Sequence, residues 1–517
     1  MLNEFEKKVL AHYGLDEEGY SLLTRAPSFS SLPLFEDRPE VDKTIARLKK
    51  ARSLQEKVII YGDYDTDGVM ATSITKIALE RFGLQAATYL PSRYLDGYGI
   101  NLNNAKKIVE AGYQLVICVD NGVSAYEAAD YLAEHGVDLL IIDHHEIQEQ
   151  GIAKSLACIH PETCHYGEEP VSAGYLSFLF SVYLTEMVDP YLLILGATST
   201  LSDMMPLRSH NRTIVRLAVE LLNQKNYPQY HNFLENRPIT ANDLSMSFIP
   251  AINAIGRMVE DSTINRLIPY FTSPYDAKME AVGRWMKAVN DERKTLTKEA
   301  ATLYVDPDSP SICLLTDLKE GLNGLVANRI LGEYDKVTCI LSPKTNDPSL
   351  LVGSIRAKEG FDVMKAMTVL KPYLVAGGGH ALAGGVTIKK DDFAAFKKTL
   401  DYLALQHQFN AAPSDLIPLK EEDVTLANAY FIESLGPFGQ GWKAPRFHFP
   451  NVKTATLSFS QKSGMLMTKY PSGWRLFSFS LSEKSFMTKK DVDLEVSFRV
   501  DCFRGHSSVE LLAEKIL

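Results

Sequence analysis

Three aspartates at alternate positions, followed by a glycine, mark the stretch VIIYGDYDTDGVMATSI. The spacing of Asp63, Asp65, Asp67 and Gly68 matches the start of a calcium-binding EF-hand loop, which needs oxygen ligands and a sharp turn. The bidentate glutamate that closes such a loop is replaced by Ile74, and a β-branched apolar run stands where an EF-hand has its entering helix. The residues therefore indicate a metal-binding turn of another kind.

Short apolar runs alternate with helix-like segments after residue 50, and this alternation must position the aspartates. The runs are KVIIYGD, AATYLP, LVICVD and DLLIID, and the helical patterns between them cover Gly68–Phe82, Asn103–Ala111 and Ala125–His135. Strand and helix repeated at this spacing predict a doubly wound parallel sheet with helices on both faces. In such sheets ligands bind at the carboxyl ends of the strands.

Further acids and two histidines fall at those strand ends. Asp120 ends LVICVDNG, His144 and His145 follow Asp143 in DLLIIDHHE, and Asp203 follows another apolar segment in TSTLSDMMPL. One aspartate at a strand end is more often a helix cap or a turn former than a ligand. Several at one sheet edge, together with two imidazoles, favour a common site.

The chemistry of that site follows from the charges. Carboxylates gathered this closely repel one another unless cations lie among them. Oxygen ligands with one or two imidazoles suit Mn²⁺ or Mg²⁺ better than Zn²⁺. A carboxylate between two ions, with Asp120 or Asp65 as the candidates, makes a two-metal site of the kind that hydrolyses phosphoryl groups.

Length and composition predict a large protein with several cores. The chain has 517 residues, is 45% hydrophobic and carries a net charge of −10, so we expect about three or four domains. The net charge argues against general electrostatic adhesion to nucleic acid but allows a local basic groove. The six cysteines form no CxxC pair, which favours free thiols in the cytoplasm. The longest apolar stretch, from Ala173, is too short to span a membrane and predicts a buried helix.

The motifs GDYDTDG, VDNG, DHH and SDMMPL, in this order, resemble those of the DHH phosphoesterase superfamily. The later motifs PSRYLDGYGIN, INAIGRM, GLVANRI, GSIRAKEGFDV, GGGHALAGGVTI and LGPFGQGWKAPRFHF resemble those of RecJ-type single-strand-specific exonucleases. The resemblance runs from about residue 50 to the end. It implies an α/β DHH domain at 51–270, a connector helix at 271–304, a smaller α/β DHH-associated domain at 305–410 and an OB-fold β-barrel at 415–517, after an N-terminal arm of 50 residues.

The resemblance also implies roles for the site residues. Asp65, Asp67, Asp120, His144 and Asp203 would ligate two divalent ions, with Asp120 also counted as catalytic. Tyr61 stands where many superfamily members have a metal-binding histidine, so Asp63 is expected to replace that ligand. His145 would face the scissile phosphate. The residues expected to hold the substrate are Arg93, Asn253, Arg257 (also counted as catalytic), Arg356, Gly378, Gly379, His380, Trp442 and Lys443.

Two of these expectations also have physical grounds in the sequence. Backbone N–H groups freed by Gly377–Gly379 are suited to cradling a phosphate, with Arg356 and His380 supplying charge. From Gly441 to Lys490 the chain has nine Lys or Arg against one acid, with aromatic residues between them. Basic and aromatic side chains together suit single-stranded DNA, whereas the alternative is a barrel with an aromatic core and a solvated lysine face. The aromatic residues are Trp442, Phe447, Phe449, Tyr470, Trp474, Phe477 and Phe479.

The sequence therefore predicts a metal-dependent enzyme that hydrolyses single-stranded DNA, with Mn²⁺ preferred over Mg²⁺. Action from the 5′ end, release of mononucleotides and a role in DNA repair or recombination are implied by the resemblance alone. So are a single-strand-binding protein and a helicase as partners, and a monomer is expected. The alternatives are a DHH phosphodiesterase for short oligonucleotides or cyclic dinucleotides, and a non-catalytic replication scaffold that binds DNA.

Overall fold

The computed structural model divides the chain into two units, which we describe separately. The barrel unit comprises Met1–Ser31, Pro206–Thr213 and Ala412–Leu517, and the main unit comprises Leu32–Met205 and Ile214–Ala411. No helix among the described residues is both long and apolar enough to cross a membrane. The described residues are 2–167, 169–235, 238–300, 305–306, 308–406, 415–461, 464–487, 490–503 and 506–517.

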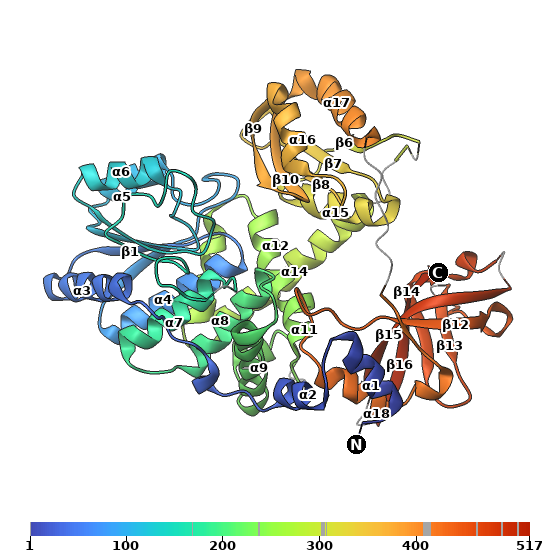
Figure 1. Ribbon diagram of the computed structural model, residues 1–517. Helices are drawn as coiled ribbons and strands as arrows, with labels where there is room; N and C mark the ends of the chain where they lie inside the picture. Colours follow the sequence, from blue (N-terminus) through green and yellow to red (C-terminus); the bar gives the residue numbers. More distant parts are fainter. Residues whose placement is uncertain are drawn as a thin grey trace. The chain divides into compact units, whose positions relative to one another are not determined.

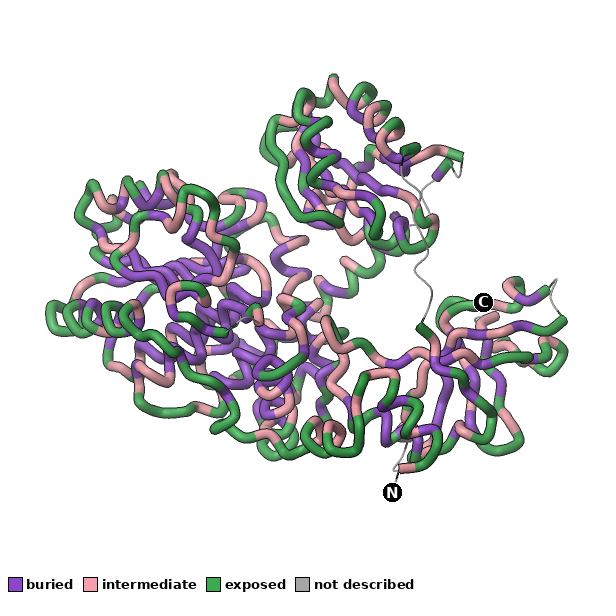
Figure 2. The backbone as a smooth tube through the Cα atoms, viewed as in Figure 1, coloured by how far each residue is buried: buried purple, intermediate pink, exposed green. Residues whose placement is uncertain are grey.

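A five-stranded parallel sheet forms the first half of the main unit. All four predicted strands are present, and a three-residue strand that the sequence did not predict, β5, extends the sheet. Figure 2 shows the centre of this sheet as buried backbone, which is why β1, β3 and β4 consist almost wholly of apolar residues. The strand order is β2 (Ala86–Tyr89), β1 (Val58–Tyr61), β3 (Leu115–Val119), β4 (Asp138–Ile142) and β5 (Ala157–Ile159).

Helices cover both faces of this sheet, as predicted. Figure 1 shows α5 (Leu102–Glu110) and α6 (Tyr126–Glu134) on one face, and α3 (Pro39–Leu54) and α4 (Thr66–Phe82) on the other. The apolar stretch from Ala173 forms the buried helix α7 (Ala173–Thr185), which packs on α4 together with α8 (Pro190–Ser202). The strand β1 before the aspartates confirms that the turn is no EF-hand.

A helical layer follows. The predicted connector is α14, observed from Ala277 to Ala300, and the remainder of the predicted span, 301–304, lies outside the described residues. A short π-helix, Leu244–Phe248, leads directly into α12. The helices of this layer are α9 (Ser209–Gln224), α10 (Pro228–His231), α11 (Ala241–Asp243), α12 (Ile249–Met258), α13 (Leu267–Thr272) and α14 (Ala277–Ala300).

The second sheet of the main unit is mixed. Its strand order is β6 (Ile312–Leu315), β7 (Thr338–Lys344), β8 (Asp347–Arg356), β10 (Ala383–Lys389) and β9 (Leu374–His380), and only β6 and β7 are parallel. The GGGH motif lies in the exposed edge strand β9. The helices of this part are α15 (Asn323–Tyr334), α16 (Val363–Leu370) and α17 (Phe393–Leu405).

The barrel unit has a six-stranded mixed sheet, consistent with the predicted OB-fold. The first 50 residues, expected as one arm, divide between the units: α1 (Glu4–His12) and α2 (Glu17–Thr24) belong to the barrel unit, and Phe5 stacks on Phe447 in its core at 5.6 Å. The unit also contains α18 (Leu426–Ser434). The strand order is β11 (Ile417–Pro418), β12 (Phe447–Lys453), β15 (Asp491–Phe503), β16 (His506–Ile516), β14 (Arg475–Ser482) and β13 (Met465–Lys469).

Candidate metal centre

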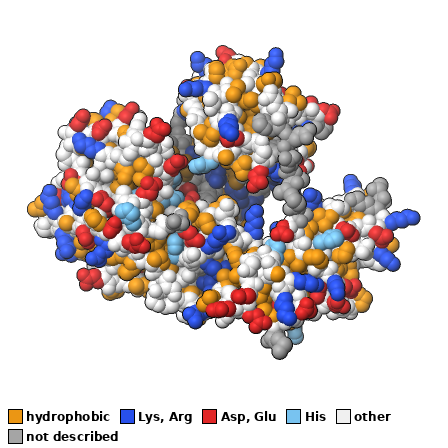
Figure 3. Space-filling model, viewed as in Figure 1, with side chains coloured by type: hydrophobic (Ala, Val, Ile, Leu, Met, Phe, Trp, Pro, Cys, Tyr) orange, Lys and Arg blue, Asp and Glu red, His pale blue; other side chains and the backbone are white. Residues whose placement is uncertain are grey.

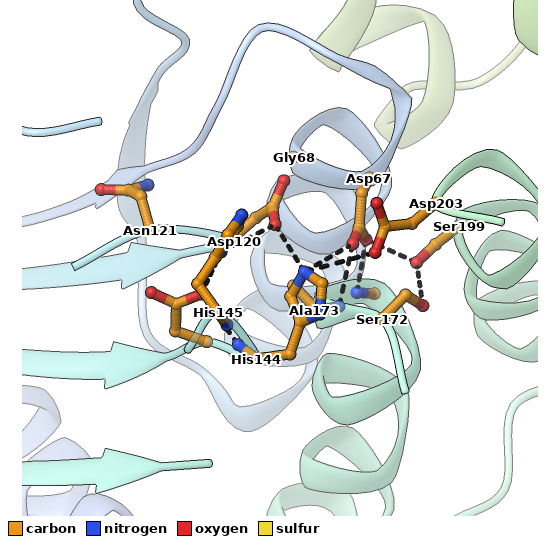
Figure 4. Close-up of polar contacts among 12 residues, drawn as sticks. Asp67, Gly68, Asp120, Asn121, His144, His145, Ser172, Ala173, Ser199 and Asp203 are labelled. Carbon is orange, nitrogen blue, oxygen red and sulfur yellow. Dashed lines mark hydrogen bonds and ion pairs between the residues drawn. The ribbon is translucent and has the colours of Figure 1, made fainter. Parts of the chain in front are cut away.

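Asp67 lies in the first turn of α4 and is fixed by donors from α7 and α8. Its carboxylate accepts hydrogen bonds from the backbone N–H groups of Ala173 and Gly174, at 3.0 and 2.8 Å, and from the Ser199 hydroxyl at 2.5 Å (Figure 4). The N-terminus of a helix favours a negative charge. Gly174 is required here because an added Cβ would lie 2.4 Å from the Ser199 hydroxyl oxygen.

Asp63 and Asp65 lie between β1 and α4. Asp65 is the N-cap of α4 and accepts from the Gly68 N–H at 3.2 Å. A side chain at Gly68 would clash, since an added Cβ would come within 2.5 Å of the Asp63 backbone nitrogen. One oxygen of Asp63, Oδ1, is buried and has no hydrogen-bond partner among the described residues. A buried anionic oxygen without a donor is costly unless a cation satisfies it.

Asp120 lies directly after β3 with a left-handed φ of 62°. Its neighbour Asn121 ties the strand ends together by donating from Nδ2 to the carbonyls of Tyr61, Gly62 and Val119, at 3.2, 3.1 and 2.9 Å. This bonding turns the Asp120 side chain toward Asp63 and Asp65, with which it forms one group of oxygen donors.

Asp143 organises the loop after β4. Its carboxylate accepts from the backbone N–H groups of Val123, His144 and His145, at 3.1, 2.8 and 3.2 Å, and pairs with His145 Nδ1 at 2.7 Å. Burial by itself would raise the pKa of Asp143, but the His145 hydrogen bond and the charges of both histidines outweigh it and lower the pKa to about 2. Asp143 is therefore an anion that holds the loop and lies outside the three groups of candidate ligands.

The two histidines differ in environment. His144 Nε2 lies 3.3 Å from Asp120, 3.5 Å from Asp203 and 3.6 Å from Asp67, and burial lowers its pKa, which favours the neutral, ligating form. Burial also acts to lower the pKa of His145, but the bond to Asp143 and its charge raise it to about 9.

Tyr98, which sequence reasoning did not assign to the site, lies beside His145. Its hydroxyl is 3.1 Å from His145 Nε2 and 3.3 Å from the Asp120 carbonyl oxygen. This tyrosine belongs to the motif PSRYLDGYGIN, and the motif is the feature of the sequence that could have assigned it to the site.

The structure brings all six predicted metal ligands together. Three overlapping groups place one ligand atom per residue within 4.8 Å of one another: Asp63 with Asp65 and Asp120; Asp67 with His144 and Asp203; and Asp120 with His144 and His145. Burial and the charges of the neighbouring aspartates raise the pKa values of Asp63 and Asp120, and raise that of Asp203 to about 8. Crowded, buried carboxylates with an unsatisfied oxygen fit divalent cations.

Tyr61, at the position where a metal-binding histidine is expected, does not face this cluster. Its ring belongs to the apolar core of the sheet, and its hydroxyl accepts from Asn104 Nδ2 at 2.8 Å and donates to the Gly99 carbonyl. The ligand group of Asp63, Asp65 and Asp120 forms without it.

Two of the predicted phosphate-binding arginines line a cleft of about 650 Å³ in the main unit. Arg93 lies over the Tyr64 ring, 4.2 Å from its centroid, and Arg257 donates to the Gly321 carbonyl at 3.4 Å. Burial and the charge of Arg93 lower the pKa of Arg257 to about 10. Two like charges held in one cleft fit an anionic ligand.

The other predicted substrate residues are placed unequally. Arg356, Gly378 and Gly379 line the same cleft, whereas His380 ends β9 outside its lining. Asn253 accepts from the Thr66 N–H and hydroxyl, at 2.9 and 2.8 Å, so its carboxamide oxygen holds the start of α4.

Trp442 and Lys443 belong to the barrel unit. Trp442 stacks on Tyr13 with ring centroids 4.5 Å apart and donates from its indole N–H to the Leu435 carbonyl at 2.9 Å. These contacts occupy one ring face and the donor. Lys443 is exposed.

The aromatic residues of the barrel divide between core and surface. Phe447, Phe449 and Trp474 are buried, whereas Phe479 is 69% exposed and packs edge-on against Phe477. Three of the seven aromatic residues therefore lie in the core of the barrel unit, as in the alternative of a barrel with an aromatic core.

The basic excess counted from the sequence is local. Residues 415–517 contain 13 Lys or Arg against 12 Asp or Glu, because five of the acids precede Gly441 and six follow Lys490. Arg475 pairs with Asp501 and Glu510, both at 2.6 Å, and Figure 3 shows basic and acidic side chains interspersed on the visible face of this unit. Lys462 and Lys489, two of the nine basic residues, lie outside the described residues.

Comparisons with known proteins agree with this architecture. Residues 57–190 match the DHH family N-terminal domain, 312–405 the DHHA1 domain and 417–515 the RecJ OB domain. The single-stranded-DNA-specific exonuclease RecJ of Bacillus subtilis is 29% identical over 415 residues, which cover 76% of this chain and 52% of that protein. The protein of the same name from Haemophilus influenzae is 24% identical, over 92% of this chain and 90% of that one.

A solved structure shares the fold along nearly the whole chain. The crystal structure of RecJ in complex with Mn²⁺ from Thermus thermophilus has a TM-score of 0.83 and 20% identity, covering 99% of this chain and 77% of that chain. Three family models therefore match this chain, in the order DHH, DHHA1 and RecJ OB, and the chain is similar in sequence and fold to RecJ-type proteins.

Proposed function

We propose that this protein is a metal-dependent exonuclease that hydrolyses single-stranded DNA from the 5′ end to mononucleotides, in DNA repair or recombination. The observation that carries the proposal is the cluster of six carboxylate and imidazole ligands, whose groups overlap at Asp120 and His144. The relatives named single-stranded-DNA-specific exonuclease support the substrate. The same cluster is the proposed site of two divalent ions, Mn²⁺ or Mg²⁺.

Two such ions, when bound, supply positive charge at the phosphate and lower the pKa of a nucleophilic water. Asp63, Asp65 and Asp120 would hold one ion, and Asp67, His144 and Asp203 the other. His145, kept protonated by Asp143, donates a proton from Nε2 to the departing oxygen. Arg93 and Arg257 neutralise the charge of the phosphate and orient it.

Phosphates farther along the strand are proposed to bind in the cleft of the main unit. Arg356 and the backbone of Gly378 and Gly379 line it, and they offer a guanidinium and the N–H group of β9 that points away from β10. On the barrel unit, the exposed ring of Phe479, beside the half-buried ring of Phe477, offers a stacking surface for bases.

Two other functions are less well supported. A phosphodiesterase for short oligonucleotides or cyclic dinucleotides needs no RecJ OB domain, which this chain has. A non-catalytic scaffold would not need to keep the metal ligands, and here all six lie together. We also propose that the enzyme acts as a monomer in the cytoplasm, with a helicase and a single-strand-binding protein supplying its substrate.

The deciding experiment follows the release of label from 5′-labelled and 3′-labelled single-stranded DNA in Mn²⁺, with a duplex of the same sequence as control. We expect the 5′ label to leave first, as a mononucleotide, and the duplex to stay intact. Release of the 3′ label first would overturn the polarity. Binding of the single strand without cleavage in Mn²⁺ or Mg²⁺ would favour the scaffold instead.

Replacing Asp143, the anion that holds the loop after β4, should slow hydrolysis without removing a metal ligand. In Asp143→Asn the hydrogen bond to His145 Nδ1 loses its charge, so the pKa of His145 falls from about 9 and less of it is protonated at neutral pH. We expect a rate loss of roughly 10- to 100-fold, as for partners that orient functional histidines.

The measurement is the initial rate on a labelled oligonucleotide between about pH 6 and pH 9. The loss should grow with pH because protonated His145 becomes scarcer in the variant. A loss of equal size at every pH would contradict the proposed role of His145 as a proton donor.

Removing the exposed ring of Phe479 should weaken strand binding. The side chain is 69% exposed on β14, and a base stacked on such a ring contributes about 1–3 kcal/mol. Phe479→Ala should therefore weaken the affinity for a long single strand by roughly 5- to 150-fold, measured by fluorescence anisotropy.

Met487→Ala is the matched control, because this apolar side chain of the same unit is 75% exposed and no stacking partner for a base. Hydrolysis of a dinucleotide by Phe479→Ala should stay at the wild-type rate. Equal affinities of both variants for the long strand would exclude Phe479 from the interface.

A further inference from the structure

The carboxylate of the candidate ligand Asp203 has little support from its neighbours among the described residues. It follows α8 as the C-cap residue, and its backbone N–H donates to the Ser199 carbonyl at 3.0 Å. Among the described residues, the polar contact of its carboxylate is His144 Nε2 at 3.5 Å, whereas Asp67 accepts three hydrogen bonds. The place of the Asp203 carboxylate therefore depends on how the backbone on either side of it is held.

The chain enters the barrel unit three residues after Asp203. The segment Pro206–Thr213 belongs to that unit and lies against the glycine-rich motif LGPFGQGW, residues 435–442, which we call the latch. The Leu207 N–H donates to the Gln440 carbonyl at 2.8 Å, and Arg208 Nε donates to the Gly441 carbonyl at 3.0 Å. These bonds fix the backbone that follows the ligand.

The glycines of the latch permit this close approach. A Cβ added at Gly439 would lie 2.8 Å from the Leu207 side chain, and one at Gly441 would lie 3.0 Å from Pro206 Cβ. Gly441 also has a φ of 70°, in the left-handed region that glycine adopts readily. A side chain at Gly441 would press on Pro206 and need a strained φ, whereas one at Gly439 would displace the end of the Leu207 side chain.

Arg212 forms further hydrogen bonds between the segment Pro206–Thr213 and the latch. It is 6% exposed, and its guanidinium donates to the carbonyls of Leu435 and Pro437, at 3.0 and 3.1 Å, and to that of Gly436. The group lies 5.7 Å from the ring of Trp442, whose indole N–H donates to the same Leu435 carbonyl. A planar fork of donors can bridge several carbonyls in this way, whereas an ammonium group is a single point of charge.

We propose that the latch is a positioning element for the metal ligand Asp203, acting through Arg212 and the segment Pro206–Thr213. The inference rests on the proposed two-metal function. It assigns a role in the reaction to a motif that contacts none of the candidate ligands, and it makes the metal centre depend on the integrity of the barrel unit.

The test is titration of the metal-free, full-length protein with Mn²⁺ by isothermal calorimetry. Wild type is expected to bind two ions, and Asp203→Asn to lose or weaken one of them. Arg212→Lys keeps the charge but loses the fork, and it should weaken the same ion by roughly 10-fold or more, as loss of supporting contacts to metal ligands does. The other ion should bind as in wild type.

Arg446→Lys is the matched control, because Arg446 is a partly buried arginine of the barrel unit that pairs with Glu514 instead of the latch. Its Mn²⁺ affinities should equal those of wild type. If Arg212→Lys does not fold, Arg208→Ala is used in its place. Arg208 is exposed, and its replacement removes one hydrogen bond to the latch. The Mn²⁺ affinity should then fall by roughly 2- to 5-fold.

Unchanged Mn²⁺ affinities in the latch variants, or an equal loss in Arg446→Lys, would overturn the positioning role while leaving the two-metal proposal intact. A wild-type protein that binds no Mn²⁺ would instead overturn the two-metal proposal itself.

Discussion

Asp120→Asn should lower the rate of single-strand hydrolysis by at least about 10³-fold in saturating Mn²⁺. Asp120 belongs to two of the three ligand groups, since it lies with Asp63 and Asp65 and also 3.3 Å from His144. The amide keeps the size of the side chain but removes the negative charge. Loss of this one charge therefore weakens the attraction for both proposed ions, whereas loss of a carboxylate in a single group would weaken one.

The measurement is single-turnover cleavage of a labelled oligonucleotide, which separates the chemical step from product release. Asp130→Asn is the control, because Asp130 is an exposed acid on α6 outside the ligand groups, and its rate should match that of wild type. Asp120→Asn should still bind the strand through the cleft and the barrel unit. A variant that cleaves within about tenfold of the wild-type rate would show that Asp120 is not shared between two ions.

The sequence predicted the placement of the candidate ligands where local rules determine the geometry. Apolar β-branched runs identified β1, β3 and β4, and the rule that ligands bind at the ends of parallel strands then brought Asp63, Asp65, Asp120 and His144 to one edge. The same rule applies to any sheet of this kind, so these residues needed no knowledge of distant contacts.

The sequence could not show contacts with parts of the chain that are distant in sequence. Asn253 stays a predicted substrate ligand, but its carboxamide oxygen also accepts hydrogen bonds from Thr66, 187 positions away. Trp442 looked like a free stacking surface, but Tyr13 covers one face. The excess of basic over acidic residues in the barrel unit held only for the stretch from Gly441 to Lys490. The acids that pair with Arg475 come later in the chain.

The sequence also does not show how several aspartates can lie close together despite their charges. The structure shows which of them receive hydrogen bonds and which do not. Asp67 is stabilised by backbone N–H groups at the start of α7 and by Ser199, and Asp143 by three backbone N–H groups and His145. Asp63, Asp120 and Asp203 lack comparable donors among the described residues, and their pKa values are raised. The repulsion is therefore concentrated on Asp63, Asp120 and Asp203, three of the acids proposed to bind metal.

The metal-free protein should accordingly lose stability as the pH rises from about 7 to about 8.5, and Mn²⁺ should stabilise it more at the higher pH. The folded-state pKa of Asp203 is raised to about 8, so the folded state binds more protons than the unfolded state in this range. The free energy of unfolding then decreases with pH. His145, with its pKa raised to about 9, contributes in the same direction, because the stability gained from its protonated form is lost as the pH rises toward that value.

The pH dependence should be read from hydrogen exchange of peptides that cover α4 and β3, because these report the main unit without the barrel unit. Saturation with Mn²⁺ at about 100 times its Kd should add about 2.7 kcal/mol for each ion to the free energy of local opening. In Asp203→Asn a repelling charge is absent, so the metal-free variant should be more protected than wild type near pH 8.5 and gain less from Mn²⁺. Protection that rises with pH in the metal-free wild type, or an equal gain from Mn²⁺ in both proteins, would mean that the crowded carboxylates are not what the ions neutralise.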